Sequence, residues 1–210
     1  MSDSIVNISQ YLQSLSKILP MLEVESPWTI TTNLENIVRN RVKTLPSEFI
    51  VNGEVAVHKD AKIEENVTLK GPIIISAGCF VGAHAYLRGG VFLDEHVVVG
   101  PGCEVKTSII LNHSALAHFN FVGDSLLGVH VNMEAGSVIA NHYNERADKT
   151  IYVALSGRTH AISVKKFGAL VGDHTKIGAN AVLSPGTILP SESIVARLEL
   201  IDQVKKLASE

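Results

Sequence analysis

The chain has 210 residues, of which 46% are hydrophobic and 19% charged, and its net charge is −3. This composition predicts one domain with a hydrophobic core and small appendages, and the slightly acidic balance argues against a nucleic-acid-binding surface. Because the sequence shows no basic-then-apolar leader and no long apolar run, we expect a cytoplasmic protein with no membrane association. Cys79 and Cys103 fall at inward positions on different faces of the repeat described below, so no disulfide is expected, and a reducing compartment suits them.

Residues 1–48 are predicted to form an N-terminal helical segment. Aliphatic residues recur at intervals of three and four over residues 4–19, which predicts an amphipathic helix stopped by Pro20: Ile5, Ile8, Leu12, Leu15 and Leu19. Residues 24–31 are interpreted as a linker. Thr32 and Glu35 have the spacing of a capping box, which predicts a second short helix continuing through Val42.

A six-residue repeat dominates residues 49–197. Branched aliphatic residues fall six apart, ten in a row: Val57, Ile63, Leu69, Ile75, Val81, Leu87, Leu93, Val99, Val105 and Leu111. A fixed short repeat predicts a parallel β-helix, in which each coil is three short strands and residues eighteen apart stack. After Leu111 the repeat reaches Ala117 and restarts at Val122, so two hexads become pentads. This slip is the first candidate for a site, because it disturbs strand pairing; an irregular corner loop is the alternative.

The remaining chain breaks from the repeat once and then resumes it. Residues 140–168 are polar and predict an inserted ordered loop that forms a binding edge. Lysines there could meet the phosphates of a nucleotide-like cofactor, or form a solvated face: Lys149, Lys165 and Lys166. The repeat returns at Val171, Ile177, Leu183, Leu189 and Val195. Residues 198–210 are predicted to form a C-terminal helix that caps the open end.

Three basic residues lie eighteen apart, each directly after an inward aliphatic residue: Lys70, Arg88 and Lys106. The spacing predicts one outward column, with neighbours about 4.8 Å apart. Like charges this close repel one another, so a bound anion such as a phosphate would stabilise the column. Long side chains that fan out into water are the alternative.

Histidines supply the candidate acid–base groups. His118 lies at the slip, and a neutral imidazole is the usual general base near pH 7. His96, His113 and His118, at spacings of 17 and 5, could instead form a zinc site that a partner subunit completes.

The stretch AHFNFVGDSLLGVHVNMEAGSVIANHYNERADKT resembles the acetyltransferase domain of the bifunctional glucosamine-1-phosphate acetyltransferase/N-acetylglucosamine-1-phosphate uridylyltransferase family. The later stretch KKFGALVGDHTKIGANAVLSPGTIL is closer to the C-terminal domains of related sugar-phosphate nucleotidylyltransferases. The resemblance covers about residues 80–195. It implies a left-handed β-helix that forms homotrimers, active sites between subunits, acetyl-CoA as co-substrate and no required metal.

The resemblance also implies roles for individual positions. In chain order, Arg88 and Lys106 bind phosphate, Glu104 and Asn132 contact the sugar, His118 is the catalytic base, the N–H near Ala135 stabilises the oxyanion, and Asn141 lies at the junction of substrate and acetyl-CoA. Three positions depart from the family: Phe121 and His142 stand in place of tyrosines, and Ala147 stands in place of a phosphate-binding lysine. Arg146 or Lys149 could take over the role of that lysine. Phe121 and Lys149 remain candidate substrate contacts, and Lys166 a candidate acetyl-CoA contact.

The expected function is transfer of an acetyl group from acetyl-CoA to an amino-sugar 1-phosphate, such as glucosamine 1-phosphate, in nucleotide-sugar biosynthesis. No nucleotidylyltransferase activity is expected, because the first 45 residues contain no Gly-rich nucleotide loop; a separate nucleotidylyltransferase is a candidate partner by analogy. Two alternatives stay open. One is a zinc enzyme resembling γ-class carbonic anhydrases, with His96, His113 and His118 as ligands, and the other is a non-catalytic assembly subunit.

Overall fold

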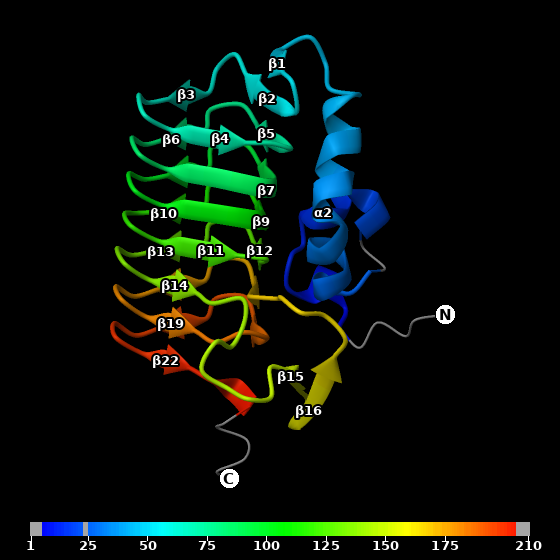
Figure 1. The fold of residues 1–210 in the computed structure, drawn as a ribbon, viewed down its shortest axis with the longest axis vertical. Coiled ribbons are helices and arrows are strands. Elements are labelled where there is room, and N and C mark those ends of the chain that lie inside the picture. Colours follow the sequence, from blue (N-terminus) through cyan, green and yellow to red (C-terminus); the bar gives the residue numbers. More distant parts are fainter. Residues whose placement is uncertain (1–5, 23–24, 205–210) are drawn as a thin grey trace.

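The six-residue repeat folds into short parallel strands that stack in three faces, with helices along one of them (Figure 1). The computed structural model describes residues 6–22 and 25–204. The expected fold class, an all-β left-handed parallel β-helix, is confirmed. Among the described residues, no helix is long and apolar enough to cross a membrane.

The strands of each face follow one another at intervals of about one coil. Face one holds β3 (Lys62–Ile63), β6 (Phe80–Val81), β8 (Val98–Val99), β10 (Ala115–Leu116), β13 (Asn132–Met133), β18 (Lys176–Ile177) and β21 (Ile194–Val195). Face two holds β4 (Thr68–Lys70), the first halves of β7 (Tyr86–Leu93) and β9 (Glu104–Ile110), β11 (Phe121–Gly123), β14 (Val138–Ile139), β19 (Val182–Leu183) and β22 (Leu200–Ile201). Face three holds β2 (Val55–His58), β5 (Ile73–Ile75), the second halves of β7 and β9, β12 (Leu126–Leu127), β17 (Ala169–Val171) and β20 (Thr187–Leu189). β1 (Phe49–Asn52) pairs antiparallel with β2.

Three corners join the faces, and each has a column of residues with positive φ. The first corner, from face three to face one, holds His96, His113, His130 and His174. The second corner, from face one to face two, holds Phe119 and Gly136. The third corner, from face two to face three, holds Gly89, Gly90, Thr107 and Asp124.

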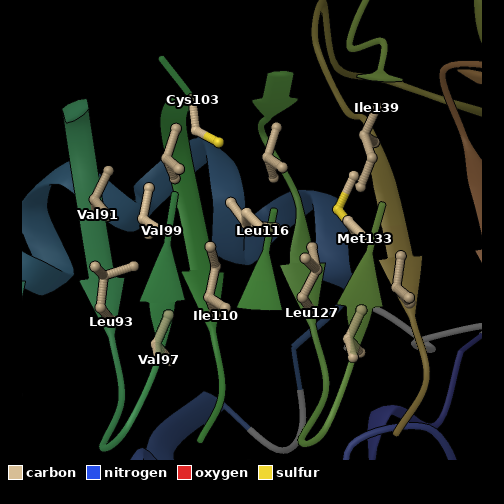
Figure 2. Close-up of a cluster of buried hydrophobic side chains, with 14 of the residues drawn as sticks. Val91, Leu93, Val97, Val99, Cys103, Ile110, Leu116, Leu127, Met133 and Ile139 are labelled. Atoms are coloured by element: carbon tan, nitrogen blue, oxygen red, sulfur yellow. The ribbon is translucent and has the colours of Figure 1, made fainter. Parts of the chain in front are cut away.

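The interior is a continuous apolar column, as the repeat predicts (Figure 2). Cys79 and Cys103 both point into it, are 1% exposed and are free thiols, as expected. However, the prediction that Leu111, the tenth aliphatic residue of the repeat, points into this interior is wrong. Ile110 belongs to the interior, whereas Leu111 packs in a second apolar cluster outside the β-helix. Leu116, not Ala117, is the next inward residue.

The third corner explains this difference. Arg88 pairs with Lys106 and Val91 with Ser108, so two glycines turn the corner in one coil and Thr107 alone turns it in the next. Thr107 has φ +49° and Asp124 φ +48°, which lets one residue make each of these tight corners. The two pentads therefore lie at Thr107 and Asp124, on the third corner, and not at His118.

The N-terminal segment differs from the predicted pair of helices. The expected helix over residues 4–19 is three short elements, the 3₁₀ turns η1 (Ile8–Gln10) and η2 (Pro20–Leu22) and the helix α1 (Leu15–Ile18), and Ile5 lies outside the described residues. The aliphatic residues are nevertheless buried, because the short elements turn the same side toward face three. The long helix α2 (Pro27–Val42) begins in the expected linker, with Ser26 as N-cap and Pro27 in its first turn. The Thr32–Glu35 capping box is thus wrong, since the Thr32 hydroxyl donates to the Trp28 carbonyl inside the helix.

The helices cover face three through a second apolar cluster, which includes Leu34, Phe92 and Phe167. Gly90 permits the close approach of α2, because a Cβ there would lie 2.8 Å from the Glu35 Cα. The inserted segment 140–168 contains an antiparallel hairpin, β15 (Ile151–Leu155) and β16 (Arg158–Ile162), whose inner side joins the same cluster.

The prediction of a C-terminal helix over residues 198–210 is wrong at its start, where strand β22 continues face two. This extra rung forms because Leu200 and Ile201 pair in register with Val182 and Leu183. Residues 203–204 are helical, and residues 205–210 lie outside the described part of the chain.

Candidate functional site on face two

The predicted basic column exists and lies on the outer surface of face two. Lys70 pairs with Arg88 in the strand register and Arg88 pairs with Lys106, so the three side chains stack as expected. The Tyr86 ring lies between the upper two, with its centroid 5.1 Å from the Lys70 Nζ and 5.5 Å from the Arg88 Cζ. These cation–π contacts hold the upper part of the column against the face.

Two carboxylates orient the lower part of the column. Arg88 donates from Nε (2.9 Å) and Nη2 (2.6 Å) to the Glu104 Oε1. The Lys106 Nζ donates to the Asp124 Oδ2 at 2.7 Å and to the Thr107 hydroxyl at 3.2 Å. A guanidinium has five N–H donors, and the Arg88 donors beyond these two have no hydrogen-bond partner among the described residues. The cations are therefore held in place with donors left for an anion, and the column keeps one more positive than negative charge.

Asp124 is a site residue that the sequence reasoning missed. It turns the third corner, its side chain is 9% exposed, and its carboxylate accepts hydrogen bonds from both Lys106 and the Asn141 amide. Its carbonyl also accepts from the Gly168 N–H at 2.9 Å, where the inserted segment returns. The signal in the sequence was the pentad from Val122 to Leu127, which places an Asp at the corner that Gly89 and Gly90 turn in an earlier coil.

Phe121 and Asn141 share the space above Gly123. A Cβ on Gly123 would lie 2.7 Å from the Asn141 Nδ2 and 2.9 Å from the Phe121 ring, so only glycine permits this arrangement. Phe121 also pairs with Glu104 in the strand register. The structure thus brings together five of the expected site residues: Arg88, Glu104, Lys106, Phe121 and Asn141.

The other expected site residues lie elsewhere within one chain. His118 is exposed at the second corner, and its carbonyl accepts from the Gly136 N–H at 2.9 Å, next to Ala135 on the following rung. Asn132 is exposed on face one. Lys149 and Lys166 are exposed on the inserted segment. Within the described residues, none of these four side chains makes a hydrogen bond, ion pair or ring contact with the column.

The first corner carries a stack of four imidazoles. The rings of His96, His113, His130 and His174 lie nearly parallel, with successive centroids 5.0 Å apart. A groove of about 730 Å³ adjoins His130 and His174, on a different corner from the basic column. Of the alternative zinc ligands, His96 and His113 are stacked and His118 lies on another corner. In the described part of one chain, no cluster of three or more His, Cys, Asp or Glu residues could hold a metal ion.

The chain is similar to several known proteins. The chain is 33% identical over 159 residues to the bifunctional protein GlmU of Methanococcus vannielii, which covers 67% of this chain and 38% of that protein. It is 31% identical over 171 residues to the bifunctional sugar-1-phosphate nucleotidylyltransferase/acetyltransferase of Sulfurisphaera tokodaii, which covers 79% of this chain and 42% of that protein. The acetyltransferase domain of PglB from Neisseria gonorrhoeae superposes with a TM-score of 0.42 and 17% identity, over 77% of this chain and 63% of that chain.

The chain spans about two fifths of the length of these two curated relatives. The family described as "GMPPB C-terminal domain" matches residues 46–204, which include every strand from β1 to β22. The expected resemblance to GlmU-type acetyltransferase domains and to the C-terminal domains of sugar-phosphate nucleotidylyltransferases is thereby confirmed, and the chain belongs to the GMPPB C-terminal domain family of hexapeptide-repeat proteins.

Proposed function

We propose that the protein transfers an acetyl group from acetyl-CoA to the amine of an amino-sugar 1-phosphate, with glucosamine 1-phosphate as the first substrate to test. The observation that carries this proposal is the oriented pair of Arg88 and Lys106, stacked in register on an exposed face with donors left open. A guanidinium beside an ammonium suits a phosphate, which accepts several charge-assisted hydrogen bonds. The Sulfurisphaera tokodaii relative, named as a bifunctional sugar-1-phosphate nucleotidylyltransferase/acetyltransferase, supports the same substrate class.

The sugar and the acetyl donor would occupy the surface around this pair. Glu104 and Asn132 would hydrogen-bond the sugar ring, and the half-buried ring of Phe121 would pack beside it. Asn141 would lie where the amine meets the thioester. Lys149 would contact the substrate phosphate and Lys166 the phosphates of acetyl-CoA; both ammonium groups are exposed on the inserted segment and free to reach a ligand.

In the proposed chemistry His118 accepts a proton as the amine attacks the thioester carbonyl. A positioned general base of this kind contributes ~10²–10⁴-fold to the rate. The backbone N–H near Ala135 would stabilise the oxyanion, and loss of such a donor costs roughly 3–4 kcal/mol. No metal is required for this step, because His118 and the N–H supply the proton acceptor and the electrostatic stabilisation.

A homotrimer would complete the site. His118 and the basic column lie at opposite edges of face two, so a second copy of the chain that packs against this face would enclose the substrate between subunits. Cytoplasmic location suits a reaction that uses acetyl-CoA and a sugar phosphate. Nucleotidylyl transfer is not part of the proposed reaction, and a separate nucleotidylyltransferase would supply it.

The first experiment is titration of the purified protein with acetyl-CoA and then glucosamine 1-phosphate, followed by an assay of CoA thiol release. His118→Ala should lower turnover by at least about 100-fold. Arg88→Ala should raise KM for the sugar phosphate by about 10–100-fold, because it removes charged hydrogen bonds, and leave KM for acetyl-CoA unchanged. The matched control is Lys62→Ala, which removes an exposed lysine from face one. A folded protein that binds no acetyl-CoA, or a His118→Ala variant with normal turnover, would refute the proposal.

A further inference from the structure

A chain of hydrogen bonds connects Asp124 to His142 through Asn141. The Asn141 Nδ2 donates to the Asp124 Oδ2, which also accepts from the Lys106 Nζ at 2.7 Å. On its other side, the Asn141 Oδ1 lies 3.0 Å from the His142 Nδ1. Asn141 and Asp124 are both buried, whereas His142 is exposed. This series of hydrogen bonds therefore begins at the buried Lys106–Asp124 ion pair and ends at His142 on the surface.

The donors and acceptors in this series of hydrogen bonds have only one consistent assignment. A carboxylate only accepts, so the Asn141 amide must turn its NH₂ group toward Asp124 and its oxygen toward His142. The amide oxygen also only accepts, so the hydrogen of the second bond belongs to the His142 Nδ1. In the neutral imidazole the proton is then on Nδ1, and the Nε2 carries a lone pair. Asp124 thus fixes the tautomer of a histidine that it does not contact.

The charged groups around His142 are already paired. Lys106 and Asp124 on the β-helix form an ion pair. On the inserted segment, Arg146 lies 3.5 Å from Glu145 and 3.0 Å from the Asp202 carboxylate, and stacks 3.6 Å from the Tyr143 ring centroid. Each of these charged groups already has a partner, so none of them competes for the Nε2 of the exposed His142 ring.

The reaction proposed above leaves one proton without an acceptor. Alkyl amines have pKa values of about 8 or more, so the substrate arrives mainly as an ammonium ion. One proton must leave before the nitrogen can attack, and a second leaves as the N–C bond forms. His118 accepts the second and returns it to the departing CoA thiolate, so it cannot also take the first.

We propose, on the basis of that function, that His142 accepts the first proton and that Asp124 is the positioning residue that prepares it. The ammonium transfers a proton to the His142 Nε2, which gives a free amine and an imidazolium. The amine then attacks the thioester carbonyl carbon, the N–C bond forms and the C–S bond breaks. After release of the amide and of CoA as the thiol, His142 returns its proton to water.

The first test needs no activity. ¹⁵N NMR of the full chain with labelled histidine should report His142 protonated at Nδ1 at neutral pH, and Asp124→Gly should remove this preference while circular dichroism stays native. Glycine removes the acceptor and adopts the positive φ of position 124 without strain, so this variant suits the test. A wild-type His142 protonated at Nε2, or a preference unchanged in Asp124→Gly, would overturn the inference whatever the protein's activity.

The second test is the pH dependence of acetyl transfer from acetyl-CoA to glucosamine 1-phosphate between pH 6 and pH 9. His142→Phe should lower kcat/KM about 100-fold at pH 6.5 and move toward the wild-type value by pH 9, where a much larger share of the amine is already deprotonated. A loss of packing alone would lower the rate equally at every pH. The matched control, His130→Phe, replaces an exposed histidine of the first corner and should follow the wild-type profile. A His142→Phe profile parallel to that of the wild type would refute the role of His142 alone, whereas a wild-type protein inactive at every pH would refute the proposed function and this inference with it.

Discussion

Asp173 hydrogen-bonds the N-terminal segment to the β-helix, and removal of its carboxylate should lower the free energy of unfolding. The residue is 3% exposed, and its carboxylate accepts from the Val129 N–H at 2.9 Å and the Gln13 N–H at 3.1 Å. Asp173→Ala leaves the buried Val129 N–H without a partner, which costs about 1–3 kcal/mol. Gln13 is exposed, so water can replace its lost bond. We therefore expect the free energy of unfolding to fall by about 2–3 kcal/mol.

Urea denaturation followed by circular dichroism would measure this loss, at one fixed protomer concentration because assembly shifts apparent stability. Limited proteolysis should also cut residues 6–22 faster in the variant. Asp148→Ala is the matched control. Its carboxylate is exposed and, in the part of the chain that the structure describes, accepts from Thr150 alone, so the change should stay within about 0.5 kcal/mol. An Asp173→Ala variant no less stable than this control would show that the two hydrogen bonds do not secure the segment.

Three further outcomes follow from other contacts. Phe121→Tyr restores a hydroxyl beside the basic column and should raise kcat/KM for the sugar phosphate about tenfold, the value of one charged hydrogen bond; an unchanged value would argue against the phosphate position. Burial raises the pKa of Cys79 to about 11 and also raises the pKa of Cys103, so a thiol reagent at pH 7.5 should label neither thiol in the folded protein and both after unfolding. The Arg197 guanidinium, with the Ala179 N–H, lowers the pKa of Glu134 to about 2. Because this pKa lies below the ordinary carboxyl value, the pair stabilises the fold at neutral pH and the effect is lost as pH falls toward 2, so the stability difference between wild type and Arg197→Ala should disappear there.

The repeat was predictable because each inward position demands an aliphatic side chain and the coil length is nearly constant. The same constancy made the fine register hard to predict, since Ile110 and Leu111 are both aliphatic and both buried. Only the corner conformation decides between them. Thr107 turns the third corner alone, and a threonine at positive φ is not a pattern that spacing reveals.

The site was predictable in part for the same reason. Lys70, Arg88 and Lys106 could be aligned because they belong to coils of eighteen residues. The link from Lys106 to Asn141 could not, because it runs through Asp124 across a seventeen-residue coil and depends on how the inserted segment returns. The start of α2 was missed because the Ser26–Pro27 pair, a standard helix start, lay in a segment interpreted as a linker.

The ring contact between Trp28 and Phe167 connects α2 to the candidate site. The ring centroids lie 5.8 Å apart in an edge-on arrangement, Phe167 is fully buried, and its N–H donates to the Asn141 carbonyl at 3.0 Å. A single intervening residue, Phe167, therefore joins α2 to the backbone that positions Asn141. The helix is thus part of the scaffold of the candidate site as well as a cover for face three.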